Sequence, residues 1–343
     1  MKPIKVLYSS NRNPYFKTFT EYIEKALGET VSKVSFFENR KFGIPGRLRT
    51  ALPFLHRLDL SLLNNRLLEQ SRGFKPDIFL ETGGWNILPG SLAKMKAEGV
   101  TTVLWTVDAP VHFENIISYA PHYDYVFCQG TEAVEILGRH NIKRLEWLPF
   151  ACDPDLHAPV EIASKEKALY GNDVSFVGSG NTDLYQNRRV LLEALSKIDL
   201  GVWGPGWETL PEDSRLKSKV RGNRTGPEDW RKIYSSSKAA ICIHYKDPAG
   251  KIPCYQASPR VFEAMACGIL LFCDRQKDVL TLFKDRKHLV IFDNAGHLKE
   301  LLLYYIAHPA EAKTIAEAGR KEVLAKHTFK DRIQELIGKI TRG

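Results

Sequence analysis

The 343-residue sequence predicts an α/β protein with two tandem, doubly wound domains that face each other across a cleft. Short β-rich runs alternate with amphipathic helical stretches, a pattern typical of parallel βαβ units. A proline-rich break near residue 150 interrupts the alternation, and a second series of strands and helices follows it. The length also suits two domains with separate hydrophobic cores.

The first half opens with a β-rich run at 4–8 and a helical pattern over 15–27, with further strands predicted at 77–81, 101–107 and 125–128. The stretch 147–159 holds three prolines, and we place the domain boundary there. The sequence therefore predicts an N-terminal domain over 1–158 and a C-terminal domain over 159–325. A helix over 326–343 could pack back on the N-terminal domain.

The second half repeats the pattern of the first. Strands are predicted at 173–178, 200–204, 239–244 and 269–273, and the tail over 297–340 is helical in pattern. Each half thus has enough elements for a parallel sheet covered by helices.

Composition excludes several classes of protein. The chain has 49 Lys and Arg against 40 Asp and Glu, and its hydrophobic content of 43% is too high for a disordered chain. No apolar run approaches the roughly 20 residues of a membrane span. The N-terminus lacks a signal-peptide pattern, so we expect a cytoplasmic protein. The six cysteines show no metal-ligand spacing and are predicted to be buried thiols.

The segment 258–274 is the most informative part of the chain. It predicts a loop, a short helix with Pro259 in its first turn, and a buried strand that ends at an acid. Ser258 and Pro259 would lie at a helix N-terminus, which favours anions. Arg260 could bind a phosphate there. Glu263 could accept hydrogen bonds from a ribose diol or complete the helix cap, and spacing alone leaves both open.

Residues 263–268, E-A-M-A-C-G, resemble the corresponding element of retaining glycosyltransferases of the GT-B fold. Segments at 105–110, 123–127, 203–207 and 315–319 are similar to the CgeB-like (spore maturation protein) branch, which is related to retaining family 4-type enzymes. The resemblance implies two Rossmann-like domains. It also implies a nucleotide-diphosphate sugar held by the C-terminal domain through Glu263, an acceptor held by the N-terminal domain, and no further cofactor.

One position departs from that family pattern. In many retaining members a second glutamate lies eight positions before the ribose-binding glutamate, and here that position is Tyr255. Tyr255 is a candidate to face the donor sugar, although the loop could also simply be packed. The stereochemical outcome, retention or inversion, therefore stays open.

A second candidate phosphate site follows the strand at 173–178. Gly178, Ser179 and Gly180 form a glycine-rich turn whose backbone N–H groups could approach a phosphate. Asp183 breaks the dinucleotide-binding fingerprint. The resemblance implies a basic residue here against the diphosphate, which favours Arg188.

On the acceptor side, Asp108 ends a predicted strand at the crevice where open α/β sheets bind ligands. Its carboxylate could orient or deprotonate an acceptor hydroxyl, or simply form a turn. His112 lies four residues on. Other residues expected at this crevice are Asn11, Arg12, Gly83 and Gly84. The D-x-D sequence at 153–155 is predicted to be a turn, and no metal site is expected.

Residues 40–72 carry seven basic side chains against two acidic ones, with leucines between them. Such a stretch could lie on an anionic leaflet or receive a phosphorylated lipid acceptor. An ordinary core-facing helix with solvated arginines would fit equally. No nucleic-acid partner is expected, because no RNA- or DNA-binding module is present.

These features predict a metal-independent hexosyl- or related glycosyltransferase with a nucleotide sugar as donor and a glycan, protein or lipid-linked acceptor. Two alternatives stay open. One is a nucleotide-sugar epimerase of the same fold, and the other is a catalytically silent nucleotide-sugar-binding partner protein. A peripheral contact with the inner face of the membrane through residues 40–72 also stays open.

Overall fold

A computed structural model describes residues 3–83, 85–107, 113–180, 184–223 and 225–342. The chain divides into unit 1, Met1–Leu148 with Ile333–Gly343, and unit 2, Pro149–Arg332. The division lies ten residues before the expected boundary. Residues 149–158 belong to unit 2 because they bond to its C-terminal part: the Cys152 amide donates to the His327 carbonyl, and the Cys152 carbonyl accepts from the Phe329 amide, both at 3.0 Å.

Unit 1 contains a parallel sheet of order β2-β1-β3-β4-β5-β6. Tyr8 of β1 pairs with Leu80 of β3 in this sheet. The chain passes from β1 to β2 on one side and returns to β3 on the other, so the carboxyl ends of β1 and β3 form the topological switch point. The strands are β1 Lys5–Ser10, β2 Lys33–Glu38, β3 Ile78–Thr82, β4 Thr101–Thr106, β5 Tyr125–Cys128 and β6 Leu145–Trp147.

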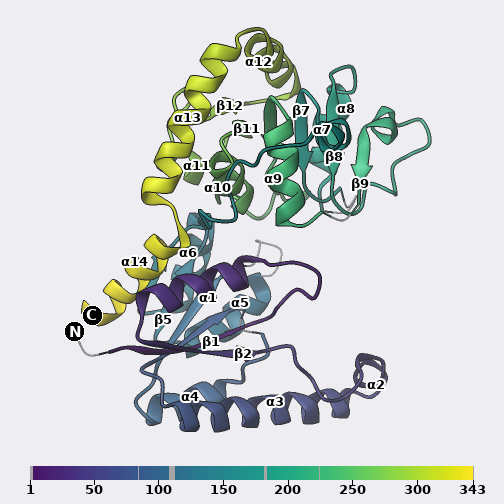
Figure 1. Ribbon diagram of the computed structural model, residues 1–343. Coiled ribbons are helices and arrows are strands. Elements are labelled where there is room, and N and C mark those ends of the chain that lie inside the picture. Colours follow the sequence, from purple (N-terminus) through teal and green to yellow (C-terminus); the bar gives the residue numbers. More distant parts are fainter. Residues whose placement is uncertain (1–2, 84, 108–112, 181–183, 224, 343) are drawn as a thin grey trace. The chain divides into compact units, whose positions relative to one another are not determined.

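Helices cover both faces of this sheet, with α1 on one face and α3 and α4 on the other (Figure 1). The predicted helix over 15–27 begins later, at Phe19, because Thr18 caps it in a capping box with Glu21. The helices of unit 1 are α1 Phe19–Thr30, α2 Gly46–Ala51, α3 Pro53–Phe74, α4 Pro89–Ala97, α5 Phe113–Tyr119 and α6 Thr131–Leu137, with 3₁₀ turns at Ala120–His122 and Gly138–His140.

Unit 2 contains a second parallel sheet, of order β12-β11-β10-β7-β8-β9, whose switch point lies between β7 and β10. Its core includes Phe176, Trp207, Phe272 and Phe292. The strands are β7 Val174–Val177, β8 Leu200–Trp203, β9 Val220–Gly222, β10 Ala239–Cys242, β11 Leu270–Asp274 and β12 Val290–Phe292. The prediction of two doubly wound α/β halves is thus confirmed.

The remaining helices follow the same alternation and then form the predicted helical tail. The helix α14 begins in unit 2, and its residues from Ile333 onward belong to unit 1. The helices are α7 Ser164–Tyr170, α8 Gln186–Ala194, α9 Pro227–Ser236, α10 Pro259–Ala266, α11 Lys277–Leu282, α12 Ala295–Ala307, α13 Pro309–Lys326 and α14 Phe329–Arg342, with a 3₁₀ turn at Arg215–Lys219.

Two smaller expectations have definite outcomes. The D-x-D sequence is a turn, as predicted, because the Asp153 carboxylate accepts the amides of Asp155 and Leu156 at 2.9 and 3.1 Å. The expectation that all six cysteines are buried is wrong for Cys254, which is half-buried in the loop before α10. Within the described ranges, no helix is long and apolar enough to cross a membrane.

Candidate functional site

The first candidate site lies where β10 and β11 of unit 2 end. His244 follows β10, and its Nδ1 atom is 2.6 Å from Oδ1 of Asp274, the last residue of β11. The other ring nitrogen, Nε2, accepts the backbone N–H of Ser258 at 2.9 Å. Because Nε2 accepts, the ring carries its hydrogen on Nδ1 and donates it to Asp274. Burial alone would raise the pKa of Asp274, but the contacts with His244 and Gln276 hold it below its ordinary value.

This ring fixes the beginning of α10. Ser258 is the N-cap residue, its hydroxyl accepts the Arg260 amide at 3.4 Å, and Pro259 is the first helical residue, as the sequence predicts. The backbone amide of Ser258 donates its hydrogen bond to His244, so its role is structural. The consequence is that the start of α10 is held at the carboxyl edge of the sheet.

Arg260 and Glu263 lie one turn apart on α10 and form an ion pair of 2.7 Å. The Arg260 guanidinium also stacks on the Trp230 ring, 3.6 Å from its centroid. Oε1 of Glu263 is 3.9 Å from Nε2 of His157. The Asp153 amide donates to Nδ1 of that histidine, so its hydrogen is on Nε2, toward Glu263. Burial lowers the pKa of His157 and keeps the ring neutral.

Arg188 of α8 joins the same edge of the sheet. Its Nε donates to the Ile243 carbonyl at 2.9 Å and its Nη1 to the Ser179 carbonyl at 3.0 Å. Burial lowers the pKa of Arg188, and the charge of Arg260 lowers it further. The structure therefore brings together two cations, Arg188 and Arg260, that disfavour each other. A bound dianion such as a diphosphate would neutralise both.

The glycine-rich turn has a packing explanation. The Gly178 amide donates to the Trp203 carbonyl and the Gly180 amide to the Pro205 carbonyl, both at 2.9 Å. A Cβ on Gly180 would lie 2.3 Å from the Trp207 ring. These two amides are thus engaged within the protein. Of the predicted phosphate contacts in this region, the Arg188 side chain carries the positive charge, although its Nε and Nη1 also donate to protein carbonyls.

Tyr255 is half-buried in the loop before α10. Its carbonyl accepts the Asp278 amide at 3.0 Å, and Nζ of Lys277 lies 4.7 Å from its ring centroid. These contacts fix the loop against α11. The catalytic role of Tyr255 stays a prediction.

The same sheet edge holds a group of potential metal ligands. The ligand atoms of Cys242, His244 and Cys273 lie within 4.8 Å of one another, and all three side chains are buried. However, both ring nitrogens of His244 are already hydrogen-bonded, to Asp274 and to the Ser258 amide. A metal ion would have to displace one of these partners, so the residues fit the hydrogen-bonded arrangement better than a metal centre.

Unit 1 has a pocket of about 660 Å³ where β1 and β3 end, at the switch point of its sheet. The predicted residues Asn11 and Gly83 line it. Gly83 has a φ of +103°, and its carbonyl accepts the Tyr119 hydroxyl at 2.6 Å. The predicted Gly84, Asp108 and His112 lie outside the described residues.

Polar, aromatic and basic side chains line this pocket. The side-chain amide of Asn39 donates to the buried carboxylate of Glu81 at 2.7 Å. The side-chain amide of Asn86 donates to the backbone carbonyl of Asn39 at 3.0 Å. Arg40 adds positive charge, Arg49 is paired with Asp59 at 3.5 Å, and the described lining residues include no carboxylate. Amide groups beside aromatic rings suit a carbohydrate, and Arg40 favours a negatively charged one.

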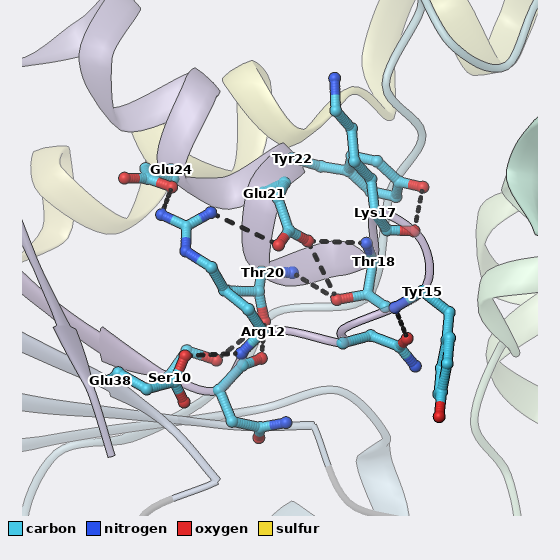
Figure 2. Close-up of polar contacts among 12 residues, drawn as sticks. Ser10, Arg12, Tyr15, Lys17, Thr18, Thr20, Glu21, Tyr22, Glu24 and Glu38 are labelled. Atoms are coloured by element: carbon cyan, nitrogen blue, oxygen red, sulfur yellow. Dashed lines mark hydrogen bonds and ion pairs between the residues drawn. The ribbon is translucent and has the colours of Figure 1, made fainter. Parts of the chain in front are cut away.

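Arg12 is predicted to lie at the acceptor crevice, and its side chain is engaged by residues of α1. Figure 2 shows its guanidinium between the side chains of Glu21 and Glu24, at 3.4 and 2.5 Å. Its backbone amide donates to Glu38 at 3.0 Å, and its guanidinium lies 4.1 Å from the Phe36 ring centroid. These contacts fix the loop between β1 and α1. A contact with the acceptor stays a prediction.

Comparison with solved structures identifies the class of fold. Sucrose-phosphate synthase from Thermosynechococcus elongatus is 13% identical, with a TM-score of 0.69, and the match covers 99% of this chain and 98% of the other. Anabaena HepE in complex with UDP-glucose is also 13% identical, with a TM-score of 0.67 and coverage of 99% and 100%. A glycosyltransferase from Rickettsia africae is 14% identical, with a TM-score of 0.65 and coverage of 98% of each chain. The chain therefore has the GT-B fold expected from its sequence.

A family model narrows the class for part of the chain. The model described as glycosyl transferase-like matches residues 187–338, which include Arg188, His244, Arg260 and Glu263. A search of curated proteins gave no match. The narrower CgeB-like assignment stays a prediction.

Proposed function

We propose that this protein is a glycosyltransferase that moves a hexosyl or related sugar from a nucleotide-diphosphate sugar to an acceptor hydroxyl. The observation that carries the proposal is the Arg260–Glu263 pair at the beginning of α10, inside the segment matched by the glycosyl transferase-like model. The complex of HepE with UDP-glucose supports a nucleotide sugar as the donor class.

In this proposal unit 2 binds the donor. The Glu263 carboxylate accepts hydrogen bonds from the ribose hydroxyls, and Arg188 and Arg260 bind the diphosphate. Their support is a fixed helix start, two cations whose charges interact, and a carboxylate one turn further on. Ser179 and the glycines beside it shape the loop through which Arg188 is held.

The reaction exchanges one bond at the anomeric carbon. The acceptor oxygen attacks that carbon on the face from which the phosphate leaves, the bond to the phosphate oxygen breaks, and the glycosidic bond forms with retention. The hydroxyl proton passes to Asp108 or to the departing diphosphate. Arg188 and Arg260 stabilise the charge that develops on the diphosphate, so the step needs no metal ion.

The acceptor is assigned to the pocket of unit 1, lined by Asn11, Gly83 and the arginines described above. Its chemistry suits a glycan with an anionic group, free or lipid-linked. A cytoplasmic location and a peripheral contact with the membrane through residues 40–72 belong to the same proposal.

Donor turnover by Glu263→Ala and Arg260→Ala tests it, with Arg275→Ala as the matched control because Arg275 pairs with Asp293 at the exposed surface. We expect both site variants to lose about 100-fold or more in donor hydrolysis or transfer. Unchanged turnover in both would overturn the site assignment. Formation of an epimerised nucleotide sugar in the absence of acceptor would support the epimerase alternative. Binding of the nucleotide sugar without any turnover would support the catalytically silent partner protein.

A further inference from the structure

The segment that joins β2 to β3 exposes an unusual row of apolar side chains. Phe54, Leu58 and Leu62 follow one another at intervals of four residues on α3, with exposed fractions of 62%, 51% and 47%. Residues four apart lie on one face of a helix. Leu48 and Leu52, in and just after α2, are exposed as well.

Positive charge surrounds this row. Arg47, Arg57 and Arg66 are exposed, whereas Asp59, the acidic residue of 46–66, is buried. The Asp59 carboxylate accepts the amides of Gly43 and Ile44, both at 2.9 Å, so its charge is used inside the unit. The exposed surface of residues 46–66 therefore combines apolar and cationic side chains without a carboxylate.

Contacts of Arg49 connect this segment to the pocket of unit 1. Arg49 of α2 pairs with Asp59 at 3.5 Å and donates to the Ile44 carbonyl at 3.0 Å. Its guanidinium also lies 3.9 Å from the ring centroid of Phe42. Arg49 and Phe42 both line the pocket. Figure 1 shows α2 at the end of α3 away from α4.

We infer that α2 and the first half of α3 dock on the surface of an anionic phospholipid bilayer, with Phe54, Leu58 and Leu62 entering the interface and the arginines contacting lipid phosphates. The combination of apolar residues with cations is the pattern that binds such surfaces. Docking holds the unit 1 pocket at the bilayer. The docking itself does not depend on the proposed function. Its consequence, a preference for a lipid-linked acceptor, rests on that function and makes the acceptor class more specific.

Vesicle co-sedimentation tests the docking without any donor or acceptor. Phosphatidylcholine vesicles are compared with vesicles containing about 30% phosphatidylglycerol, and the wild type with the double variant Leu58→Glu, Leu62→Glu. The matched control is Leu303→Glu, because Leu303 of α12 is 54% exposed but lies outside this segment. We expect wild type and control to bind the anionic vesicles, and the double variant about ten-fold or more weakly.

A gain-of-signal variant keeps the test independent of folding defects. A tryptophan placed by Leu58→Trp should be quenched by brominated lipid in the anionic vesicles, and one placed by Leu303→Trp should not. Equal binding by the double variant, no binding by the wild type, or a dimer in vesicle-free solution that Leu58→Glu dissociates would each overturn the inference. None of these results depends on donor turnover, so failure here and failure of the proposed function are distinguishable.

Discussion

Asp274 accepts a hydrogen bond from His244 across two neighbouring parallel strands, with 2.6 Å between Oδ1 and Nδ1. Through its second nitrogen the same ring holds the amide of Ser258, the N-cap of α10. The carboxyl ends of β10 and β11 and the start of α10 are thereby joined through one side chain. Arg260 and Glu263 depend on this connection for their position.

The first prediction concerns that connection. His244→Ala leaves the Asp274 carboxylate and the Ser258 amide without the ring that bonds both, so we expect a loss of about 1–3 kcal/mol in the free energy of unfolding. Affinity for the nucleotide sugar should fall with it, by about ten-fold. Urea unfolding and calorimetry measure the two effects. Asp274→Asn, which keeps an oxygen acceptor for the ring, is the milder control, and unchanged affinity in His244→Ala would refute the positioning role.

The second prediction separates packing from phosphate binding at the glycine-rich turn. In Gly180→Ala the new Cβ would lie 2.3 Å from the Trp207 ring. Overpacking of this kind costs about 1–3 kcal/mol in stability. The melting temperature should therefore fall, while any donor binding by the folded fraction changes little. A variant as stable as the wild type would contradict the packing explanation.

The third prediction is a pH dependence from His327, whose ring packs against Phe283 with 5.0 Å between centroids. Burial, helped by the charge of Arg332, lowers the pKa of His327 to about 4. The unfolded chain has a histidine pKa of about 6.5, so on acidification it binds the proton first. The stabilisation is complete above about pH 6.5 and is lost as the pH falls toward 4.

The size of this effect is about 2–3 kcal/mol in the free energy of unfolding. Urea unfolding at several pH values between 4 and 7 measures it. His327→Gln keeps an acceptor for the Arg332 guanidinium, which lies 2.7 Å from the histidine Nδ1, but removes the titration. An identical pH dependence in this variant would show that other groups are responsible.

The fourth prediction concerns thiol reactivity. Burial raises the pKa values of Cys128, Cys152 and Cys267 to about 12. The pKa of Cys242 is lowered to about 7 by its hydrogen bond with Cys273, but both of these thiols are buried, whereas Cys254 is half-buried. Native protein at pH 8 should therefore show one fast-reacting thiol with an aromatic disulfide reagent, and urea should expose the rest. Cys254→Ser should abolish the fast phase. Rapid reaction of several thiols in that variant would contradict the burial pattern.

Much of the fold could be predicted from the sequence because both halves have strong local signals. The run 125–128 is a strand at the predicted residues, and the helical tail resolves into α12, α13 and α14. The β2 strand gave a weaker signal, since Phe36 and Phe37 lie beside the polar residues Ser35 and Glu38. Residues 149–158 are predicted to belong to the N-terminal domain, but they lie in unit 2. The sequence could not group them with unit 2, because their partners lie near residue 328.

The candidate site was only partly predictable. Arg260 and Glu263 are one turn apart on a helix, so sequence spacing places them together. His157, Trp230 and His244 reach the same site from segments far apart in the chain, and only the tertiary fold brings them there. The strand-end positions of His244 and Asp274 carried a usable signal, because ligands of α/β sheets bind where strands end.

The central claim is that unit 2 binds a nucleotide sugar at the start of α10, and a crystal structure of the protein soaked with UDP-glucose, or with the donor that a thermal-shift panel selects, tests it most directly. The account predicts diphosphate density within hydrogen-bonding distance of the Arg188 and Arg260 guanidinium groups, with the ribose at Glu263. Ordered nucleotide density at any other place, with these three side chains unchanged, would contradict it.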